Sequence, residues 1–377
     1  MKVLLITTSF PQSASGQEAA GSFVADFARE LSRRVEVVVV APGEQEAREV
    51  DKSGLVVYRY RAPLQPLSSL KPMNFRHWLP ILSTLASGRR VSMRAARDMD
   101  ADFVLALWAL PCGLWAKRVS DSLHIPYATW ALGSDIWSLA KVPVVRSILK
   151  KVLRAADSRF ADGYQLAQDV EILCGKSCKF LPSARQLPVC GLPLVHKPPY
   201  RLAFLGRWHP NKGVDLLLDA LEKLSDDDWS RIERVRIAGG GPLETLVQSK
   251  VNLLRSHNRP VLLEGYKNVQ EAGELLVWSD VVLIPSRVES IPVIFSDAIQ
   301  AKRFVLVSAV GDFPVLLSQA NKETTGCLVS PATSERIRDV LVDTLRLDAV
   351  AVSGNSMSIS LDHAVNYLLK TIEKFRV

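Results

Sequence analysis

Cysteine is scarce in this chain of 377 residues, and its five copies lie far apart, at Cys112, Cys174, Cys178, Cys190 and Cys327. Their odd number and irregular spacing exclude the disulfide framework of a small secreted protein. Cys174 and Cys178 have no second pair of cysteines or histidines at the spacing of a zinc site. We therefore expect reduced, buried thiols, no metal, and a cytoplasmic location.

Long apolar runs are also missing. No stretch reaches the ~18 uninterrupted apolar residues of a membrane span. The best candidate, residues 103–116, is broken by Pro111. The apolar run within residues 1–9 is too short for a signal peptide and is typical of a first buried strand. The sequence thus predicts a protein with neither a spanning helix nor a leader.

A glycine-rich dinucleotide motif is absent as well. Residues 8–16, which follow the first predicted strand, contain no Gly-x-Gly-x-x-Gly. This absence disfavours a nucleotide-dependent oxidoreductase, although doubly wound folds also hold dinucleotides.

The chain is rich in apolar residues, 48% against 23% charged, which excludes disorder and low complexity. Short apolar runs alternate with helical patterns along its length, which indicates parallel sheets covered on both faces. We predict an α/β protein of two doubly wound Rossmann-like domains facing a cleft. The predicted domains are residues 1–195 and 200–357, followed by a C-terminal helix within residues 358–377 that packs back toward the first domain.

The loops after the strands of the second half carry the candidate site, because open α/β sheets bind ligands beyond the carboxyl ends of their strands. The first such loop, residues 206–213, starts with Gly206 and Arg207 and ends with Lys212 and Gly213. Its two cations and the start of the next helix predict an anion site suited to a diphosphate. Two solvated surface cations are the alternative interpretation.

Two further loops are candidates for the same edge of the sheet. Gly239 and Gly241 lie in a turn that either admits a ligand close to the backbone or simply needs glycine to turn. Glu289 follows the next predicted strand, and Asp297 lies eight positions later in a helix. Two acids beside a helix start can bind two sets of ligand hydroxyls. In the alternative interpretation, Glu289 is a solvated loop residue and Asp297 an ordinary helix residue, and neither binds a ligand.

The order and spacing of these motifs resemble the retaining glycosyltransferases of the GT-B fold, specifically glycosyltransferase family 4 (group 1). The resemblance is strongest over about residues 201–330, where loop 206–213 is followed by the glycine turn and then by Glu289-x7-Asp297. The first half matches more loosely, through Gly21 and its neighbours and through residues 132–135.

The resemblance implies a nucleoside diphosphate sugar as the donor substrate, with no metal or other cofactor. Arg207 and Lys212 match the pair that holds the donor diphosphate, and Glu289 matches the acid that contacts the donor sugar. These three are the expected catalytic residues. The expected donor-binding residues are Gly21, Gly206, Gly239, Gly241, Ser290, Ile291 and Asp297, the last of them at the ribose.

The chain departs from the family pattern at three places. Asp297 replaces the usual glutamate, Leu132 replaces a common histidine, and Ser-Ala at residues 183–184 replaces Asn-Gly. Asp135, three residues after Leu132, is expected on the acceptor side.

The leading hypothesis is an enzyme that transfers a sugar, with retention, to a lipid-linked or polysaccharide acceptor in cell-surface glycan biosynthesis. No side chain is an obvious nucleophile, so we expect front-face displacement in which a donor phosphate oxygen takes the acceptor proton. The departures leave open a degenerate, non-catalytic relative that binds nucleotide-sugar or membrane.

The excess of positive over negative charge is confined to the first half of the chain. The whole chain carries a net charge of +8, but residues 1–198 carry +9 and the rest −1. Basic residues are mixed with apolar ones in two stretches, residues 67–100 and 141–159. The mixture is typical of proteins that bind the surface of an anionic bilayer, whereas two amphipathic helices with solvated outer faces are the alternative.

A helix predicted over residues 79–99 would place Arg90, Arg94 and Arg97 on one face, with Trp78 just before its start. We predict that these four residues face the inner surface of the cell membrane as a peripheral contact. No nucleic-acid-binding module is recognisable, so nucleic acid is not an expected partner.

Overall fold

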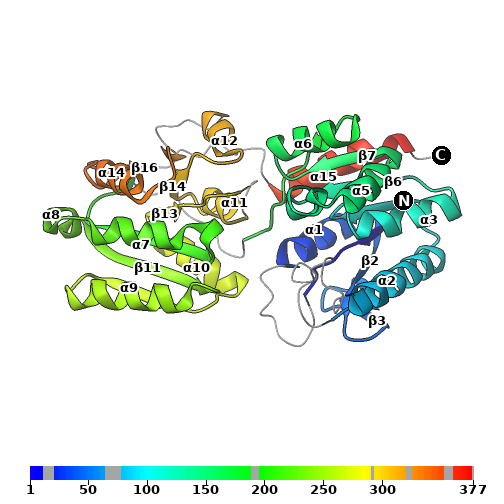
Figure 1. Ribbon diagram of the computed structural model, residues 1–377, viewed down its shortest axis with the longest axis horizontal. Helices are drawn as coiled ribbons and strands as arrows, with labels where there is room; N and C mark the ends of the chain where they lie inside the picture. Colours follow the sequence, from blue (N-terminus) through cyan, green and yellow to red (C-terminus); the bar gives the residue numbers. More distant parts are fainter. Residues whose placement is uncertain are drawn as a thin grey trace. The chain divides into compact units, whose positions relative to one another are not determined.

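The computed structural model describes residues 1–11, 21–63, 78–187, 195–289, 293–319, 325–351 and 360–375. The chain forms two compact units (Figure 1). Unit 1 comprises residues 1–183 together with 361–377, and unit 2 comprises residues 184–360.

Unit 1 is built on an eight-stranded sheet with the strand order β3-β4-β2-β1-β5-β6-β7-β8. Neighbouring strands are parallel except for β3, which runs antiparallel to β4 at one edge. The strands are β1 (Lys2–Ile6), β2 (Glu36–Gly43), β3 (Ala47–Val50), β4 (Val56–Arg61), β5 (Phe103–Leu107), β6 (Tyr127–Ala131), β7 (Ser158–Ala161) and β8 (Lys179–Phe180).

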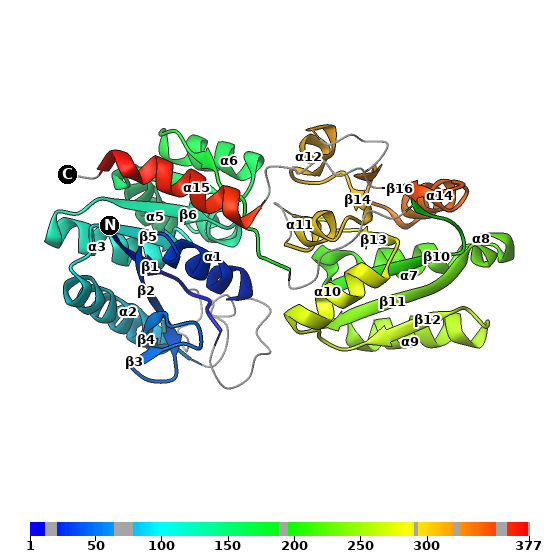
Figure 2. The ribbon, with the colours of Figure 1, turned by 180° about the vertical axis from the view of Figure 1, so that it is seen from behind.

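Helices cover both faces of this sheet, because successive strand side chains point to opposite sides. Val3 and Leu5 of β1 pack with the first and last helices of the unit, whereas Leu4 and Ile6 pack with helices of the opposite layer. One layer holds α1 (Ser22–Ser32) and α15 (Leu361–Ile372), which lie side by side in Figure 2. The other layer holds α2 (Trp78–Met99), α3 (Cys112–Leu123), α5 (Pro143–Ala155) and α6 (Tyr164–Cys174), with the short α4 (Ser134–Trp137) before α5.

Unit 2 is built on a six-stranded parallel sheet with the order β12-β11-β10-β13-β14-β15. Its strands are β10 (Tyr200–Arg207), β11 (Ile232–Gly240), β12 (Val261–Glu264), β13 (Val281–Ile284), β14 (Phe304–Ser308) and β15 (Gly326–Val329). A separate antiparallel pair joins β9 (Val195–His196) to β16 (Val350–Ala351).

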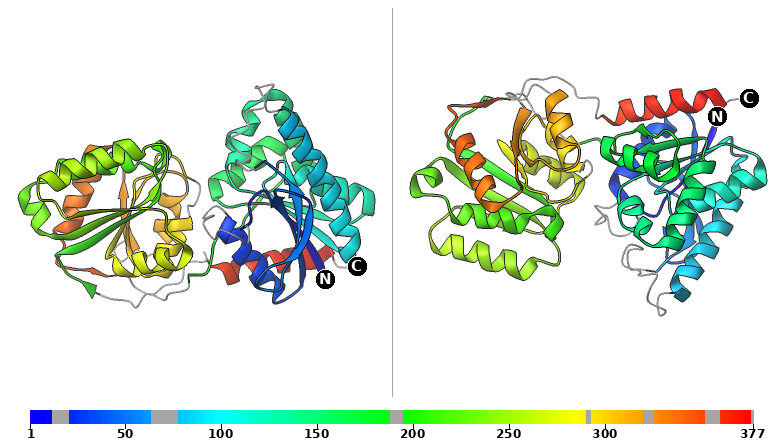
Figure 3. Two further views of the ribbon diagram at one scale, coloured as in Figure 1. Left: turned by 90° about the horizontal axis from the view of Figure 1, so that it is seen from below. Right: turned by 45° about the horizontal axis from the view of Figure 1, so that its top comes forward.

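The helices of unit 2 also lie on both faces of its sheet (Figure 3). Leu202 and Phe204 of β10 pack with one layer of helices, while Ala203 between them packs with α10 on the other side. The helices are α7 (Val214–Glu222), α8 (Asp226–Ser230), α9 (Glu244–Ser256), α10 (Val269–Trp278), α11 (Val293–Gln300), α12 (Phe313–Gln319) and α14 (Ser334–Leu345).

The strand order places a topological switch point beside β10. The chain moves from β10 outward to β11 and β12, and then returns to the other side of β10 to build β13, β14 and β15. The loops after β10 and β13 therefore leave the sheet in opposite directions, and the carboxyl edge between them is where doubly wound folds bind ligands.

The predicted α/β class, with two doubly wound units, is confirmed. The apolar pattern did not reveal β4, because its alternating tyrosines and arginines look like a solvated segment although Arg59 is buried. The observed division falls after Ser183 rather than at residues 195–200, since Arg185 forms an ion pair with Asp297 of α11 in unit 2.

The attachment of α15 to unit 1 gives a test of the core. Leu368 is fully buried in the cluster that α15 shares with α1 and the sheet, whereas Lys370 of the same helix is exposed. Leu368→Ala is expected to lower the free energy of unfolding by about 2–5 kcal/mol because it leaves a cavity. Lys370→Ala is expected to change it by less than about 0.5 kcal/mol. Urea denaturation of both variants checks this, and equal stabilities would show that α15 is not part of the core.

Candidate functional site

The loops at the carboxyl edge of the unit 2 sheet pack backbone against backbone. Gly213 follows the β10 loop with φ +69°, and a Cβ there would collide with the carbonyl oxygen of Pro285 in the β13 loop. Gly239, at the end of β11 with φ +146°, would likewise collide with the carbonyl oxygen of Gly206. Glycine is therefore required at both positions, and it brings the three loops together.

Polar contacts join the β10 and β13 loops further. The backbone N–H of Arg287 donates to the carbonyl of Asn211 at 2.8 Å. Its guanidinium donates to the carbonyl of Pro210 at 2.6 Å and to both carboxylate oxygens of Asp215, at 2.7 and 2.8 Å. The sequence pattern did not reveal this clamp, although Arg287 lies in the same loop as Glu289.

Lys212 and Glu289 meet where these two loops are joined. The ammonium of Lys212 donates to Oε1 of Glu289, and the hydroxyl of Ser286 donates to the same oxygen at 3.0 Å. The Lys212 side chain is 32% exposed and that of Glu289 is 10% exposed, so the pair is partly accessible to a ligand. An ammonium in this setting can donate to phosphate oxygens, and a carboxylate can accept from sugar hydroxyls.

Arg207 is the last residue of β10, and Trp208 follows it in the same loop that carries Lys212. Arg207 is exposed, and within the described part of the chain its guanidinium has no ion pair or hydrogen bond. Trp208 is buried, and its backbone carbonyl lies so close to Gly241 (φ +148°) that a Cβ there would be 2.8 Å away. The indole N–H of Trp208 has no acceptor among the described residues, so the loop holds a buried donor that the sequence analysis did not identify.

Gly206 differs from the other glycines of the site. A Cβ there would touch only the Phe204 ring, at an ordinary distance of 3.6 Å. Its importance within the described residues lies in its carbonyl, which approaches Gly239.

Asp297 is held by a residue of the segment that leads into unit 2. It is fully buried in α11, and its Oδ2 accepts from Nε and Nη2 of Arg185 at 2.8 and 2.5 Å. The side-chain amide of Gln300 donates to the carbonyl of Arg185 at 2.9 Å. The structure thus places the residue predicted at the ribose inside a buried ion pair. Ser290 and Ile291 lie outside the described residues.

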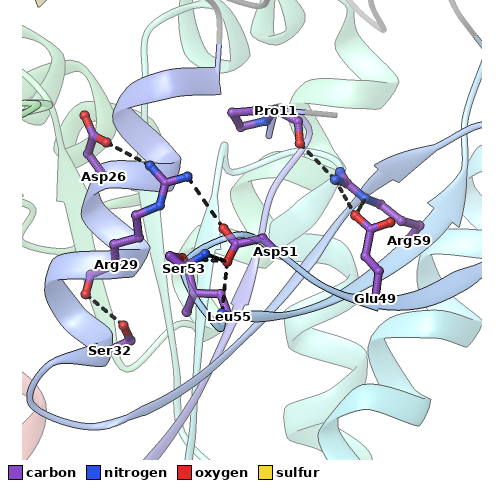
Figure 4. Close-up of polar contacts among 9 residues, drawn as sticks. All are labelled: Pro11, Asp26, Arg29, Ser32, Glu49, Asp51, Ser53, Leu55 and Arg59. Carbon is purple, nitrogen blue, oxygen red and sulfur yellow. Dashed lines mark hydrogen bonds and ion pairs between the residues drawn. The ribbon is translucent and has the colours of Figure 1, made fainter. Parts of the chain in front are cut away.

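Gly21 lies in unit 1, where it precedes the first turn of α1. A Cβ there would be 2.9 Å from the backbone nitrogen of Phe10, so glycine lets the start of α1 approach the loop after β1. The same loop is fixed from the other side by Arg59, whose guanidinium donates to the carbonyl of Pro11 at 2.8 Å and pairs with Glu49 (Figure 4).

Asp135 is buried in α4 of unit 1, and it binds backbone rather than facing outward. Oδ2 accepts from the N–H of Ala109 at 2.5 Å, and Oδ1 accepts from the N–H of Leu132 at 3.3 Å. Burial raises the pKa of Asp135 to about 6, against the lowering effect of these amides. In the structure it joins the loop after β5 to the loop after β6.

The four residues predicted to face a membrane all lie on α2. Trp78 begins this helix and is 56% exposed. Arg90 forms an ion pair with Glu46, and Nε of Arg94 lies 3.9 Å from a carboxylate oxygen of Asp98. Arg97 is exposed in the last turn.

Comparison with known proteins identifies the domain around the Lys212–Glu289 pair. Residues 199–346 match the family described as Glycosyl transferases group 1. These residues are therefore similar to a group 1 glycosyltransferase domain. The match covers β10 to β15 together with α14 and includes Arg207, Lys212, Glu289 and Asp297.

Relatives extend the likeness to both units of the chain. The Bacillus subtilis protein TuaC, named for a glycosyltransferase role in teichuronic acid biosynthesis, is 24% identical over 90% of this chain and 88% of its own. The crystal structure of Anabaena HepE in complex with UDP superposes with a TM-score of 0.72 at 13% identity, covering 99% of this chain and 100% of that one. A lipopolysaccharide outer core galactosyltransferase, WaaB, gives a TM-score of 0.62 at 15% identity, over 99% and 100% of the two chains. The fold is therefore that of the GT-B glycosyltransferases.

The buried ion pair of Arg185 and Asp297 in unit 2 gives a second test. Removing one partner of a buried ion pair leaves an uncompensated charge, which costs about 3–5 kcal/mol. Asp297→Asn and Arg185→Gln are therefore each expected to lower the unfolding free energy of unit 2 by that amount. In the double variant the loss of unfolding free energy is expected to be at least about 1 kcal/mol smaller than the sum of the two single losses. The difference is the coupling energy of two residues in contact. Additive effects in denaturant titrations would show that the pair contributes no coupling.

The buried carboxyl of Asp135 predicts a pH dependence. Its pKa in the folded state, about 6, lies above the ordinary value of 3.8, so the folded state binds its proton more tightly than the unfolded state does. The stability that it contributes is complete below about pH 4 and is lost as the pH rises through about 6. The resulting loss is about 3 kcal/mol.

Asp135→Asn removes this titration. Between about pH 4.5 and 7.5 the variant is expected to gain about 2–3 kcal/mol of stability relative to the native chain. Asp121→Asn, an exposed carboxyl on α3, serves as the control and is expected to show no such gain. A stability difference between Asp135→Asn and the native chain that is the same at both pH values would contradict the raised pKa.

Proposed function

We propose that this protein is a retaining glycosyltransferase of family 4 that transfers a sugar from a nucleoside diphosphate sugar to an acceptor hydroxyl. The observation that carries the proposal is the contact between Lys212 and Glu289 at the switch point of a group 1 glycosyltransferase domain. It puts a cation suited to a diphosphate beside a carboxylate suited to a sugar, in the loops where this fold binds ligands.

The departing nucleoside diphosphate gains negative charge in the transition state. Lys212 and Arg207 are proposed to stabilise that charge, each through charge-assisted hydrogen bonds worth about 1.5–3 kcal/mol. Arg207 can turn toward a ligand without breaking an ion pair within the described part of the chain. We propose that the reaction needs no metal, because fixed cations and the helix start supply the charge.

Glu289 is proposed to bind the donor sugar. Its Oε1 is held by Lys212 and by Ser286, which fixes the carboxylate in the loop. Since no nucleophilic side chain is assigned at this edge, we propose front-face displacement, in which an oxygen of the departing phosphate takes the acceptor proton.

The acceptor is proposed to be lipid-linked or a polysaccharide, in the synthesis of a cell-surface glycan at the cytoplasmic face of a membrane. The name of TuaC refers to teichuronic acid and that of WaaB to lipopolysaccharide, which supports a surface-glycan acceptor. The complex of HepE with UDP supports a nucleoside diphosphate as the carrier of the donor sugar.

One observation favours a second candidate function. Arg185 occupies Oδ2 of Asp297, which was expected at the donor ribose, so a ribose contact there requires the ion pair to rearrange. A non-catalytic protein that binds nucleotide-sugar without turning it over is consistent with such a change.

Substitutions at the pair separate the two candidates. Lys212→Ala is expected to weaken nucleoside diphosphate binding by about 1.5–3 kcal/mol in calorimetry. Glu289→Gln is expected to abolish donor hydrolysis without weakening nucleotide binding, because it frees the Lys212 ammonium for phosphate.

Lys223 provides the matched control, since it also pairs with a glutamate, Glu335, but lies at the other end of α7. Lys223→Ala is expected to leave both nucleotide binding and hydrolysis unchanged. Nucleotide binding without hydrolysis in the native chain would favour the non-catalytic candidate, and unchanged nucleotide binding in Arg207→Ala/Lys212→Ala would contradict the assigned site.

A further inference from the structure

Large apolar side chains are exposed at the starts of two helices of unit 1. On α2, Leu79 is 80% exposed and Leu82 is 59% exposed. On α5, Val144 is 71% exposed and Ile148 is 38% exposed. Val144 and Ile148 are four residues apart, so they share one face of α5, whereas Leu149 and Leu153 on its other side are buried in the core.

Both helix starts project beyond the start of α3, which lies between them (Figures 1 and 3). The indole N–H of Trp115, in the first turn of α3, donates to the carbonyl of Leu85 at 3.1 Å. Leu85 lies seven residues after Trp78, the first residue of α2. The start of α2 therefore lies about 10 Å beyond this contact along the helix axis.

On the other side of α3, a Cβ at Gly113 would lie 2.7 Å from a methyl group of Val152. Val152 lies nine residues after Pro143, the first residue of α5. The start of α5 therefore lies about 13 Å beyond this contact along the helix axis. All three helices lead from one parallel strand to the next and run in the same direction, so α2 and α5 overhang α3 at the same end.

Positive charge is concentrated in the sequence of α5 and of the turn that precedes it. Residues 136–156 contain five lysines and arginines and no aspartate or glutamate. Lys141 and Lys151 are exposed and form no ion pair with any described residue, and Lys151 shares the face of Val144 and Ile148 by its spacing. In contrast, Arg90 and Arg94 of α2 are engaged by Glu46 and Asp98.

We propose that Leu79, Leu82, Val144, Ile148, Lys141 and Lys151 form a docking rim that binds the surface of an anionic bilayer. Exposed aliphatic side chains at two projecting helix ends can enter the headgroup region, and the unpaired lysines beside them complement anionic lipid. Binding to a bilayer goes beyond the proposed function. Only the role of that binding, which is to hold the enzyme beside a lipid-linked acceptor, rests on the proposed function. Of the two basic stretches predicted to meet a membrane, the docking rim takes its cations from residues 141–159, and not from Arg90, Arg94 and Arg97 of α2.

Vesicle flotation of the full chain tests the docking rim. The native protein is expected to float with vesicles of phosphatidylcholine and phosphatidylglycerol at low salt, to stay behind with pure phosphatidylcholine, and to be released by added salt. Lys141→Gln/Lys151→Gln is expected to weaken binding roughly 30-fold, as the loss of two cations near an anionic surface should. Val144→Glu/Ile148→Glu is expected to abolish it.

Two control variants carry matched changes away from the docking rim. Ile172→Glu adds a charge at an 82% exposed isoleucine of α6, and Arg90→Gln/Arg94→Gln removes two cations that already have acidic partners. Both are expected to bind vesicles like the native chain. Calorimetric binding of UDP by each variant shows that the fold and the donor site are intact.

Three outcomes would overturn the docking rim. They are no binding of the native chain to anionic vesicles, equal binding by Val144→Glu/Ile148→Glu, or a loss of self-association rather than of vesicle binding in that variant. Vesicle binding that follows these expectations in a chain that neither binds nor hydrolyses a nucleotide-sugar would uphold the docking rim and reject the proposed function.

Discussion

Close backbone packing at two glycines determines the geometry of the carboxyl edge of the unit 2 sheet. Gly213 and Gly239 have positive φ values and lie against the carbonyl oxygens of Pro285 and Gly206. Any side chain at either position would push neighbouring loops apart. The contact of Lys212 with Glu289 depends on this packing, because the two residues are carried by the loops that Gly213 holds together.

Several charged residues of this protein are buried in order to hold loops. Arg59 fixes the loop after β1, Asp135 joins the loops after β5 and β6, and Arg185 ties the segment entering unit 2 to α11. A buried charge is costly unless it is paired, so each of these side chains specifies the position of its partner strongly. Asp297 is an example. The sequence pattern predicted that it binds a ligand, but in the structure its carboxylate pairs with Arg185, from a distant part of the chain.

Parallel strands, which form the carboxyl edge of the unit 2 sheet, also shape a helix layer of unit 1. Because the strands are parallel, the helices that connect them run in one direction, and their starts collect at one end of the layer. A helix that is longer than its neighbours then projects there, as α2 and α5 do beyond α3. The length of a connecting helix is therefore enough to expose a surface such as the docking rim.

The sequence by itself determined the alternation of strands and helices and the candidate loops, although not β4. The alternation of apolar strands and helices is a local property, and it was enough for the α/β class and for the loops that contain Lys212, Glu289 and the glycine turn. The tertiary structure alone decided the partners of the charged side chains. Arg287 meets Asp215 across 72 residues, and Arg185 meets Asp297 across 112. Which of these distant residues meet depends on the order of the strands and the packing of the loops. The charged groups of an ion pair must lie within about 4 Å of each other, and the sequence around one residue does not indicate its partner.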